Sequence, residues 1–168
     1  MELSGALTDR MDDLKKRIQQ EIEKLEYELR IELPKEILKA RAHGDLSENA
    51  EFHAAKERQR YVDASLVKLK LRLAELSLVD LTKIPRDRVG LGSKVVVLDL
   101  KKDEEISYRL VASEESDFAN GMISTSSPIG KGLLGKKVGD EVTISIPGGE
   151  RKLEILELTT IHDATDPE

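Results

Sequence analysis

The sequence has 168 residues, of which 36% are charged and 3% are aromatic, with no Trp and no Cys. So few large apolar side chains argue against one bulky core, and so much charge favours long solvated helices. The net charge is −6, from 27 Lys and Arg against 33 Asp and Glu. This argues against tight binding to free nucleic acid, because duplex binding normally uses a basic stripe.

The composition also bears on the compartment. Residues 1–10 lack the basic and apolar regions of a signal peptide, and no apolar run approaches the ~18 residues that a membrane span needs. Without Cys, disulfides and thiolate metal sites are excluded. We therefore expect a cytoplasmic protein with no membrane partner.

Residues 1–82 are expected to form an antiparallel helical hairpin. Apolar residues spaced by three or four, as in a coiled-coil seam, occur in two segments: Met11, Leu14, Ile18, Ile22, Leu25 and Leu29 in the first, and Val62, Leu66, Leu69, Leu73 and Leu76 in the second. Between the segments, Gly44 suits the left-handed end of one helix and Asp45 can cap the next. Pro34 removes one helical hydrogen bond, so it should kink the first arm or restart it.

Residues 83–160 change to the period of β-strands. Four strands are expected, at 94–98, 106–111, 141–146 and 152–158. The last two alternate apolar and polar residues, as half-buried antiparallel strands do. Hairpin turns are expected at 99–105 and 147–150, with a short helix from Pro128 to Leu134. Residues 161–168 are expected to form an acidic tail. The fold class is therefore α+β, with a helical hairpin followed by a small β-rich domain.

Asp45 and Glu48 stand three residues apart at the turn of the hairpin, so both carboxylates can point outward at its tip. Two such carboxylates can share a hard cation such as Mg²⁺, but they need further ligands from another molecule to hold it tightly. The same spacing is also a capping box, which would open the second helix by satisfying two free amides. The two interpretations are compatible. Substitution by Asn or Gln separates them, because an amide still caps a helix but binds a cation poorly.

Two separated stretches, Gly44–Lys56 and Ile123–Gly135, closely resemble the GreA/GreB family of bacterial transcript-cleavage factors, and GreA above all. The resemblance runs from about Pro34 to Leu158. It implies a coiled-coil hairpin followed by an FKBP-like domain. The first 33 residues depart from the family's usual opening, which puts the length of the hairpin and its junction with the second domain in doubt.

The resemblance implies an elongation factor that binds bacterial RNA polymerase and inserts its hairpin into the secondary channel. There Asp45 and Glu48 would help to hold a catalytic Mg²⁺, and the polymerase would supply the remaining ligands of the ion. The 3′ end of a backtracked RNA would then be cut off. The chain would then be a catalytic cofactor without hydrolase activity of its own. We expect the chain to be a monomer, although the sequence does not determine its oligomeric state.

The resemblance also implies supporting roles. Arg41 and Lys56 match positions that contact the extruded RNA, although on position alone they are ordinary solvated charges. Ser47 and Asn49 would orient the acidic pair, and Phe52 would support the tip. The residues implied in docking on the polymerase could also be a plain turn before a helix: Ser126, Ser127, Pro128 and Ile129.

Three other functions compete with transcript cleavage. A relative of the same fold could enter the channel and inhibit the polymerase, but such relatives tend to alter the acidic tip. A peptidyl-prolyl isomerase would need an aromatic-lined pocket, for which the second half offers only Tyr108 and Phe118. A coiled-coil adaptor without chemistry would leave the acidic tip and the second motif unexplained.

Overall fold

A computed structural model describes residues 3–44 and 48–163, which divide into two compact units. The hairpin unit spans Met11–Val79, and the sheet unit combines the first ten residues with the chain from Asp80 onward. Within the described residues, no helix is long and apolar enough to cross a lipid bilayer. The expected fold, a long helical hairpin followed by a β-rich domain, is confirmed.

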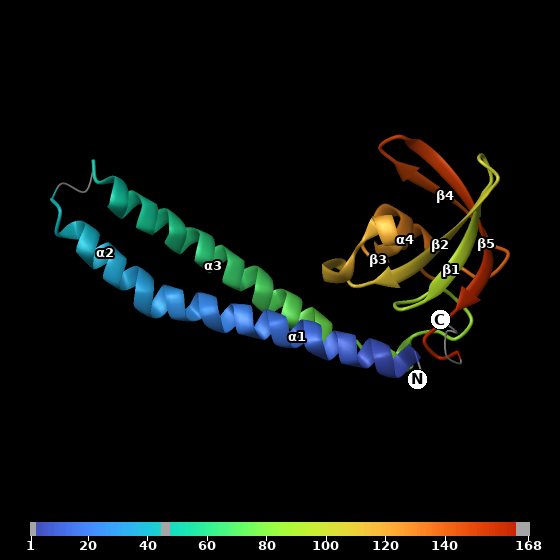
Figure 1. The fold of residues 1–168 in the computed structure, drawn as a ribbon, viewed down its shortest axis with the longest axis horizontal. Helices are drawn as coiled ribbons and strands as arrows, with labels where there is room; N and C mark the ends of the chain where they lie inside the picture. Colours follow the sequence, from blue (N-terminus) through green and yellow to red (C-terminus); the bar gives the residue numbers. More distant parts are fainter. Residues whose placement is uncertain (1–2, 45–47, 164–168) are drawn as a thin grey trace. The chain divides into compact units, whose positions relative to one another are not determined.

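The hairpin unit consists of two helical arms that run side by side in opposite directions (Figure 1). The first arm comprises α1 (Leu3–Tyr27) from Met11 onward, a π-helical segment (Glu28–Glu32) and α2 (Leu33–Arg41), and the second is α3 (Ala50–Ser77). The predicted seam residues line the contact between the arms. Those that are buried are Met11, Leu14, Ile18, Ile22, Leu25, Val62, Leu66 and Leu76, and those that are partly buried are Leu29, Leu69 and Leu73.

The first arm is not one continuous α-helix. The amide of Leu33 donates to the carbonyl of Glu28, five residues earlier, which closes a π-turn just before Pro34. Pro34 lacks an amide hydrogen and its ring crowds the carbonyl four residues back, so a wider turn relieves the clash. The wider turn also keeps the apolar seam in phase, because the seam crosses it in successive steps of four residues: Leu25, Leu29, Leu33 and Ile37. The predicted restart at Pro34 is confirmed, and its form is a π-helix.

Different residues end α2 and begin α3 at the tip of the hairpin. Gly44 follows α2 with φ of +113°, in the positive region that its position predicted. The prediction for the start of α3 is wrong: the N-cap is Asn49, and not Asp45. Asn49 takes this position because its Oδ1 accepts a hydrogen bond from the Phe52 amide, which is otherwise free at the start of α3.

The sheet unit is built on a curled five-stranded sheet (Figure 1). Its strands are β1 (Lys94–Asp99), β2 (Glu104–Val111), β3 (Met122–Ser124), β4 (Glu141–Ile146) and β5 (Gly149–Thr159), in the spatial order β3-β2-β1-β5-β4. Neighbouring strands are antiparallel except for β2 and β3, which are parallel. The four predicted strands are confirmed, whereas the short β3 was not predicted.

The predicted short helix is present as α4 (Pro128–Leu133), which follows β3 and contacts β4. Its apolar side joins the core of the sheet unit, which is made of Val89, Val95, Val97, Tyr108, Leu110, Ile123, Ile129, Leu133, Val142, Ile144, Leu153 and Ile155. The stretch expected as an acidic tail begins with Ile161, which is 2% exposed. The β-sheet and α4 therefore hold the segment around Pro128 on a packed core.

Candidate functional site

Asn49 closes the tip of the hairpin by binding both arms. Its Oδ1 accepts a hydrogen bond from the Phe52 amide at 3.0 Å, and its Nδ2 donates to the carbonyl of Ala40 in α2 at 2.6 Å. One side chain thus satisfies a free amide at the start of α3 and a carbonyl at the end of α2. Asn49 therefore connects the end of α2 to the start of α3.

Glu48 directly precedes Asn49 and is exposed. No hydrogen bond or ion pair joins Glu48 to another described residue. Asp45 and Ser47, the other residues predicted to carry and support the chemistry, lie outside the described residues. In the described ranges, no group of three or more His, Asp or Glu side chains could hold a metal ion alone. A cation at Glu48 would need ligands from elsewhere.

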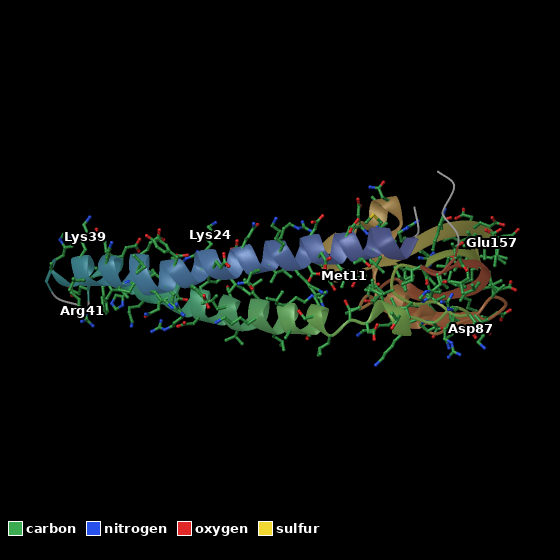
Figure 2. All side chains as sticks on the ribbon, turned by 90° about the horizontal axis from the view of Figure 1, so that it is seen from below. Met11, Lys24, Lys39, Arg41, Asp87 and Glu157 are labelled. Carbon is green, nitrogen blue, oxygen red and sulfur yellow. The ribbon has the colours of Figure 1, made fainter. Side chains whose placement is uncertain are left out.

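Arg41 and Phe52, which are eleven residues apart in the sequence, lie together at the tip. The guanidinium carbon of Arg41 is 5.9 Å from the centroid of the Phe52 ring, within the range of a cation–π contact. Figure 2 shows Arg41 and Lys39 at the end of the hairpin. One turn along α3 from Phe52, Lys56 donates from Nζ to Oε1 of Gln59 at 3.0 Å. Arg41 is exposed and Lys56 is half-buried, so both cations can still meet a phosphate.

Two ion pairs that were not predicted from the sequence join the arms below the tip. Arg58 donates to both carboxylate oxygens of Glu28, at 2.6 and 2.9 Å, and Nζ of Lys70 lies 2.8 Å from Oε1 of Glu26. The hydrogen bond from Arg58 lowers the pKa of Glu28, and the hydrogen bond from Lys70 lowers the pKa of Glu26. The only sequence signal for these pairs is opposite charge on both arms, because the partners are 30 or more residues apart.

The four residues predicted to dock on a partner surround the start of α4. Ser127 is the N-cap of this helix, and its Oγ accepts a hydrogen bond from the Gly130 amide at 3.1 Å. Ser126 and Pro128 are exposed. Ile129 is 7% exposed and belongs to the core of the sheet unit. Ser126 and Pro128 are therefore the members of this segment that a partner can reach most easily.

A mostly apolar groove of about 340 Å³ opens beside this segment. Its apolar lining includes Phe118, Ile123, Pro128, Ile146 and Pro147. Phe118 is 64% exposed and is the single aromatic side chain among the described residues that line the groove. The groove is therefore unlike the aromatic-lined pocket that a peptidyl-prolyl isomerase needs, and its exposed apolar surface is typical of a contact site for a protein.

Comparison with known families matches both units. A family described as "Transcription elongation factor, N-terminal" matches residues 12–77, which include the hairpin tip. A second, described as "Transcription elongation factor, GreA/GreB, C-term", matches residues 84–160, which include the segment around Pro128 and its groove. A chain with this hairpin and this sheet is a transcription elongation factor. It belongs to the GreA/GreB family, and the resemblance found in its sequence is confirmed.

Two relatives named GreA agree with this assignment. "Transcription elongation factor GreA" of a Nitratiruptor species is 46% identical over 142 residues, which cover 84% of this chain and 86% of that protein. The protein of the same name from Thermodesulfovibrio yellowstonii is 41% identical over 91% of this chain and 99% of its own. Among solved structures, GreA factor homolog 1 of Thermus thermophilus is 28% identical, covering 86% of this chain and 94% of that chain, with a TM-score of 0.40.

Proposed function

We propose that this chain binds bacterial RNA polymerase in the cytoplasm, inserts its hairpin into the secondary channel and stimulates cleavage of backtracked RNA. The observation that carries the proposal is the exposed Glu48, which directly precedes the residue that ties both arms together. A carboxylate at the end of a stiff hairpin can be delivered into the active centre of another molecule. The names of the GreA relatives support elongation as the process in which the chain acts.

The tip residues fit Mg²⁺ as part of a coordination shell that the chain would share with the polymerase. This ion prefers carboxylate oxygens in an octahedral arrangement and keeps several waters, so one or two protein carboxylates are a usual contribution. Glu48, with Asp45 three residues before it, would supply that contribution, and the polymerase would supply the remaining ligands. When bound, the ion would activate water and stabilise the charge on the phosphate under attack. Asn49, with Ser47 in the same loop, would hold the two carboxylates at the end of the hairpin.

Arg41 and Lys56 would contact the phosphates of the extruded 3′ end. Such contacts position a nucleic acid without reading its sequence, which suits a factor that must act on any transcript. The ring of Phe52 would hold the guanidinium of Arg41 at the tip, since the two groups are 5.9 Å apart.

The segment Ser126–Ile129 and the adjoining apolar groove would dock on the polymerase. Ser126 and Pro128 offer exposed atoms, and Ser127 fixes the segment by capping α4. With Ile129 in the core of the sheet unit, the segment would approach the polymerase as a preformed surface. Docking through one unit would leave the hairpin unit free to carry the tip carboxylates.

The test is transcript shortening in a halted, backtracked complex of bacterial RNA polymerase with labelled RNA. The wild-type chain should speed removal of the 3′ end, and Asp45→Asn and Glu48→Gln should each reduce the stimulated rate by at least about tenfold while still binding polymerase. Glu57→Gln is a matched control, because the side chain of Glu57 is 78% exposed on α3 away from the tip. If the wild-type chain binds and fails to speed cleavage, the chain is instead a channel-entering regulator of the same family.

A second measurement tests whether the chain cuts RNA in the absence of the polymerase. We expect the purified chain with Mg²⁺ and no polymerase to leave labelled RNA intact, because most ligands of the ion would belong to the polymerase. RNA cut by the chain alone would contradict its role as a catalytic cofactor. A preparation of Glu48→Gln, tested in parallel, identifies any contaminating nuclease.

A further inference from the structure

Helix α3 carries a second apolar stripe on the face opposite its buried seam. This outer stripe consists of Ala64, Val67, Leu71 and Ala74 of α3 and of Leu78, the C-cap that directly follows the helix. All five residues are exposed, with Val67 at 68%, Leu71 at 60% and Leu78 at 84%. At about 100° per residue, the outer stripe is centred roughly 160° from the seam residues of the same helix. Single exposed apolar side chains are ordinary on a protein surface, but five aligned along four turns form a continuous patch.

The spacing of the outer stripe specifies a helical partner. Its members follow one another in steps of three, four, three and four residues, which is the a/d pattern of a two-stranded coiled coil. The first of them, Ala64, occupies an a position and Val67 the following d position. A loop or a sheet edge would not need this regular step, whereas a second helix inserts its side chains between residues spaced in this way.

The charges beside the outer stripe specify a second copy of this chain. Asp63 and Lys70 occupy g positions, and Lys68 and Glu75 occupy e positions. In a parallel pair, each g residue faces the e residue five positions later in the partner helix. Two identical copies would therefore set Asp63 opposite Lys68 and Lys70 opposite Glu75, and the two-fold symmetry repeats both pairs.

We propose that two copies of this chain associate through their α3 helices, in parallel, along the outer stripe. Lys70 and Glu75 already make contacts within the chain, with Glu26 at 2.8 Å and Arg72 at 3.3 Å. Their side chains are nevertheless 56% and 54% exposed, so they remain accessible to a partner. The stripe spans about two heptads and buries less than the roughly 1,200 Å² of a stable interface. We therefore expect a weak dimer, whereas the sequence predicted a monomer.

Sedimentation of the full-length chain over about 10 µM to 1 mM tests the association. The wild type should shift from the 18.8 kDa monomer to a dimer within this range. Leu71→Glu should raise the dissociation constant at least about tenfold, because it places a charge in the middle of the stripe. Leu38→Glu is the control, since Leu38 is 71% exposed on α2 outside the stripe and its change should leave the dimer intact. A wild type that stays monomeric at 1 mM, or a Leu71→Glu variant that dimerises normally, overturns the proposal.

Orientation and charge are tested separately. Because the chain has no Cys, an engineered thiol is unique. Val67→Cys should form a disulfide with its counterpart in a parallel dimer, whereas in an antiparallel pair position 67 would face other residues and stay reduced. Lys68→Asp should weaken the dimer by setting like charges opposite each other, and the double variant Asp63→Lys, Lys68→Asp should restore it. A double variant as weak as Lys68→Asp, or an unlinked Val67→Cys, overturns the parallel arrangement.

Discussion

Asn49 uses both halves of its amide at the tip, and this explains why an amide and not a carboxylate occupies the position. The oxygen caps α3 and the nitrogen donates to the end of α2. An aspartate would cap equally well, but it has no donor for the Ala40 carbonyl. The neighbouring Glu48 takes no part in either bond.

Variants of Asn49 separate the two hydrogen bonds. Asn49→Ala loses both, and we expect it to destabilise the first turn of α3 by about 1–2 kcal/mol. Asn49→Asp keeps the cap and loses the bond to Ala40, so the first turn should stay close to wild type. Hydrogen exchange of the Phe52 amide is the direct measurement: it should be fast in Asn49→Ala and slow in Asn49→Asp. Equal protection of Phe52 in all three proteins would show that another group caps the helix.

The helical arms show which features of an element can be predicted from sequence. The seams were predictable, because burial on one side of a helix leaves a direct record in residue spacing. Pro34 indicated a break in the first arm, but the choice between a kink and a π-turn depends on keeping Leu33 in the seam, which requires the packed structure. The pair Glu28–Arg58 depends on the register of the arms, and the N-cap at Asn49 depends on the length of the turn. Neither the ion pair nor the N-cap can be predicted from the residues next to it in the sequence.

Leu33 is expected to carry much of the packing where the first arm restarts. It is 1% exposed, whereas Leu38 on the same helix is 71% exposed. Leu33→Ala should therefore destabilise the hairpin unit by about 2–4 kcal/mol, and Leu38→Ala should change its stability by less than about 0.5 kcal/mol. Amide hydrogen exchange across α2 and α3 measures both. Similar losses in the two variants would mean that α2 does not pack through Leu33.

The ion pair between Glu28 and Arg58 should make the hairpin sensitive to acid. The hydrogen bond from Arg58 holds the pKa of Glu28 below its ordinary value. A lowered folded-state pKa stabilises the hairpin above the pKa of the unfolded carboxyl, and this stability is lost as the pH falls through the folded pKa.

Melting temperatures of the wild type and Glu28→Gln should therefore differ most near neutral pH, by a small amount because the pair is partly exposed, and should converge in acid. The control is Glu57→Gln, which removes a more exposed ion pair with Arg60 inside α3 and should have less effect at neutral pH. A gap between wild type and Glu28→Gln that persists unchanged at low pH would assign the effect to packing instead.

At the scale of the whole molecule, one helix serves both units. The first residues of α1 belong to the sheet unit and the rest of the helix to the hairpin unit. In the sheet unit, Leu7 is 2% exposed, and it packs where Gly92 has φ of +81°. A Cβ at Gly92 would clash with Ile161 and lie 3.0 Å from Cδ2 of Leu7, so this close approach requires glycine. The start of the chain is therefore an integral part of the sheet unit, although sequence periodicity alone assigned it to the hairpin.

This sharing predicts that two similar changes in α1 will act on different units. Leu7 and Leu14 are both 2% exposed in the same helix, but Leu7 belongs to the sheet unit and Leu14 to the hairpin unit. We expect Leu7→Ala to cost the sheet unit about 2–5 kcal/mol and Leu14→Ala to cost the hairpin unit a similar amount. Hydrogen exchange resolved along the chain reads each unit separately, with amides of β1 and β5 reporting on one and those of α3 on the other. If both variants loosen α3 equally and leave β1 and β5 unchanged, the first ten residues stabilise the hairpin and not the sheet.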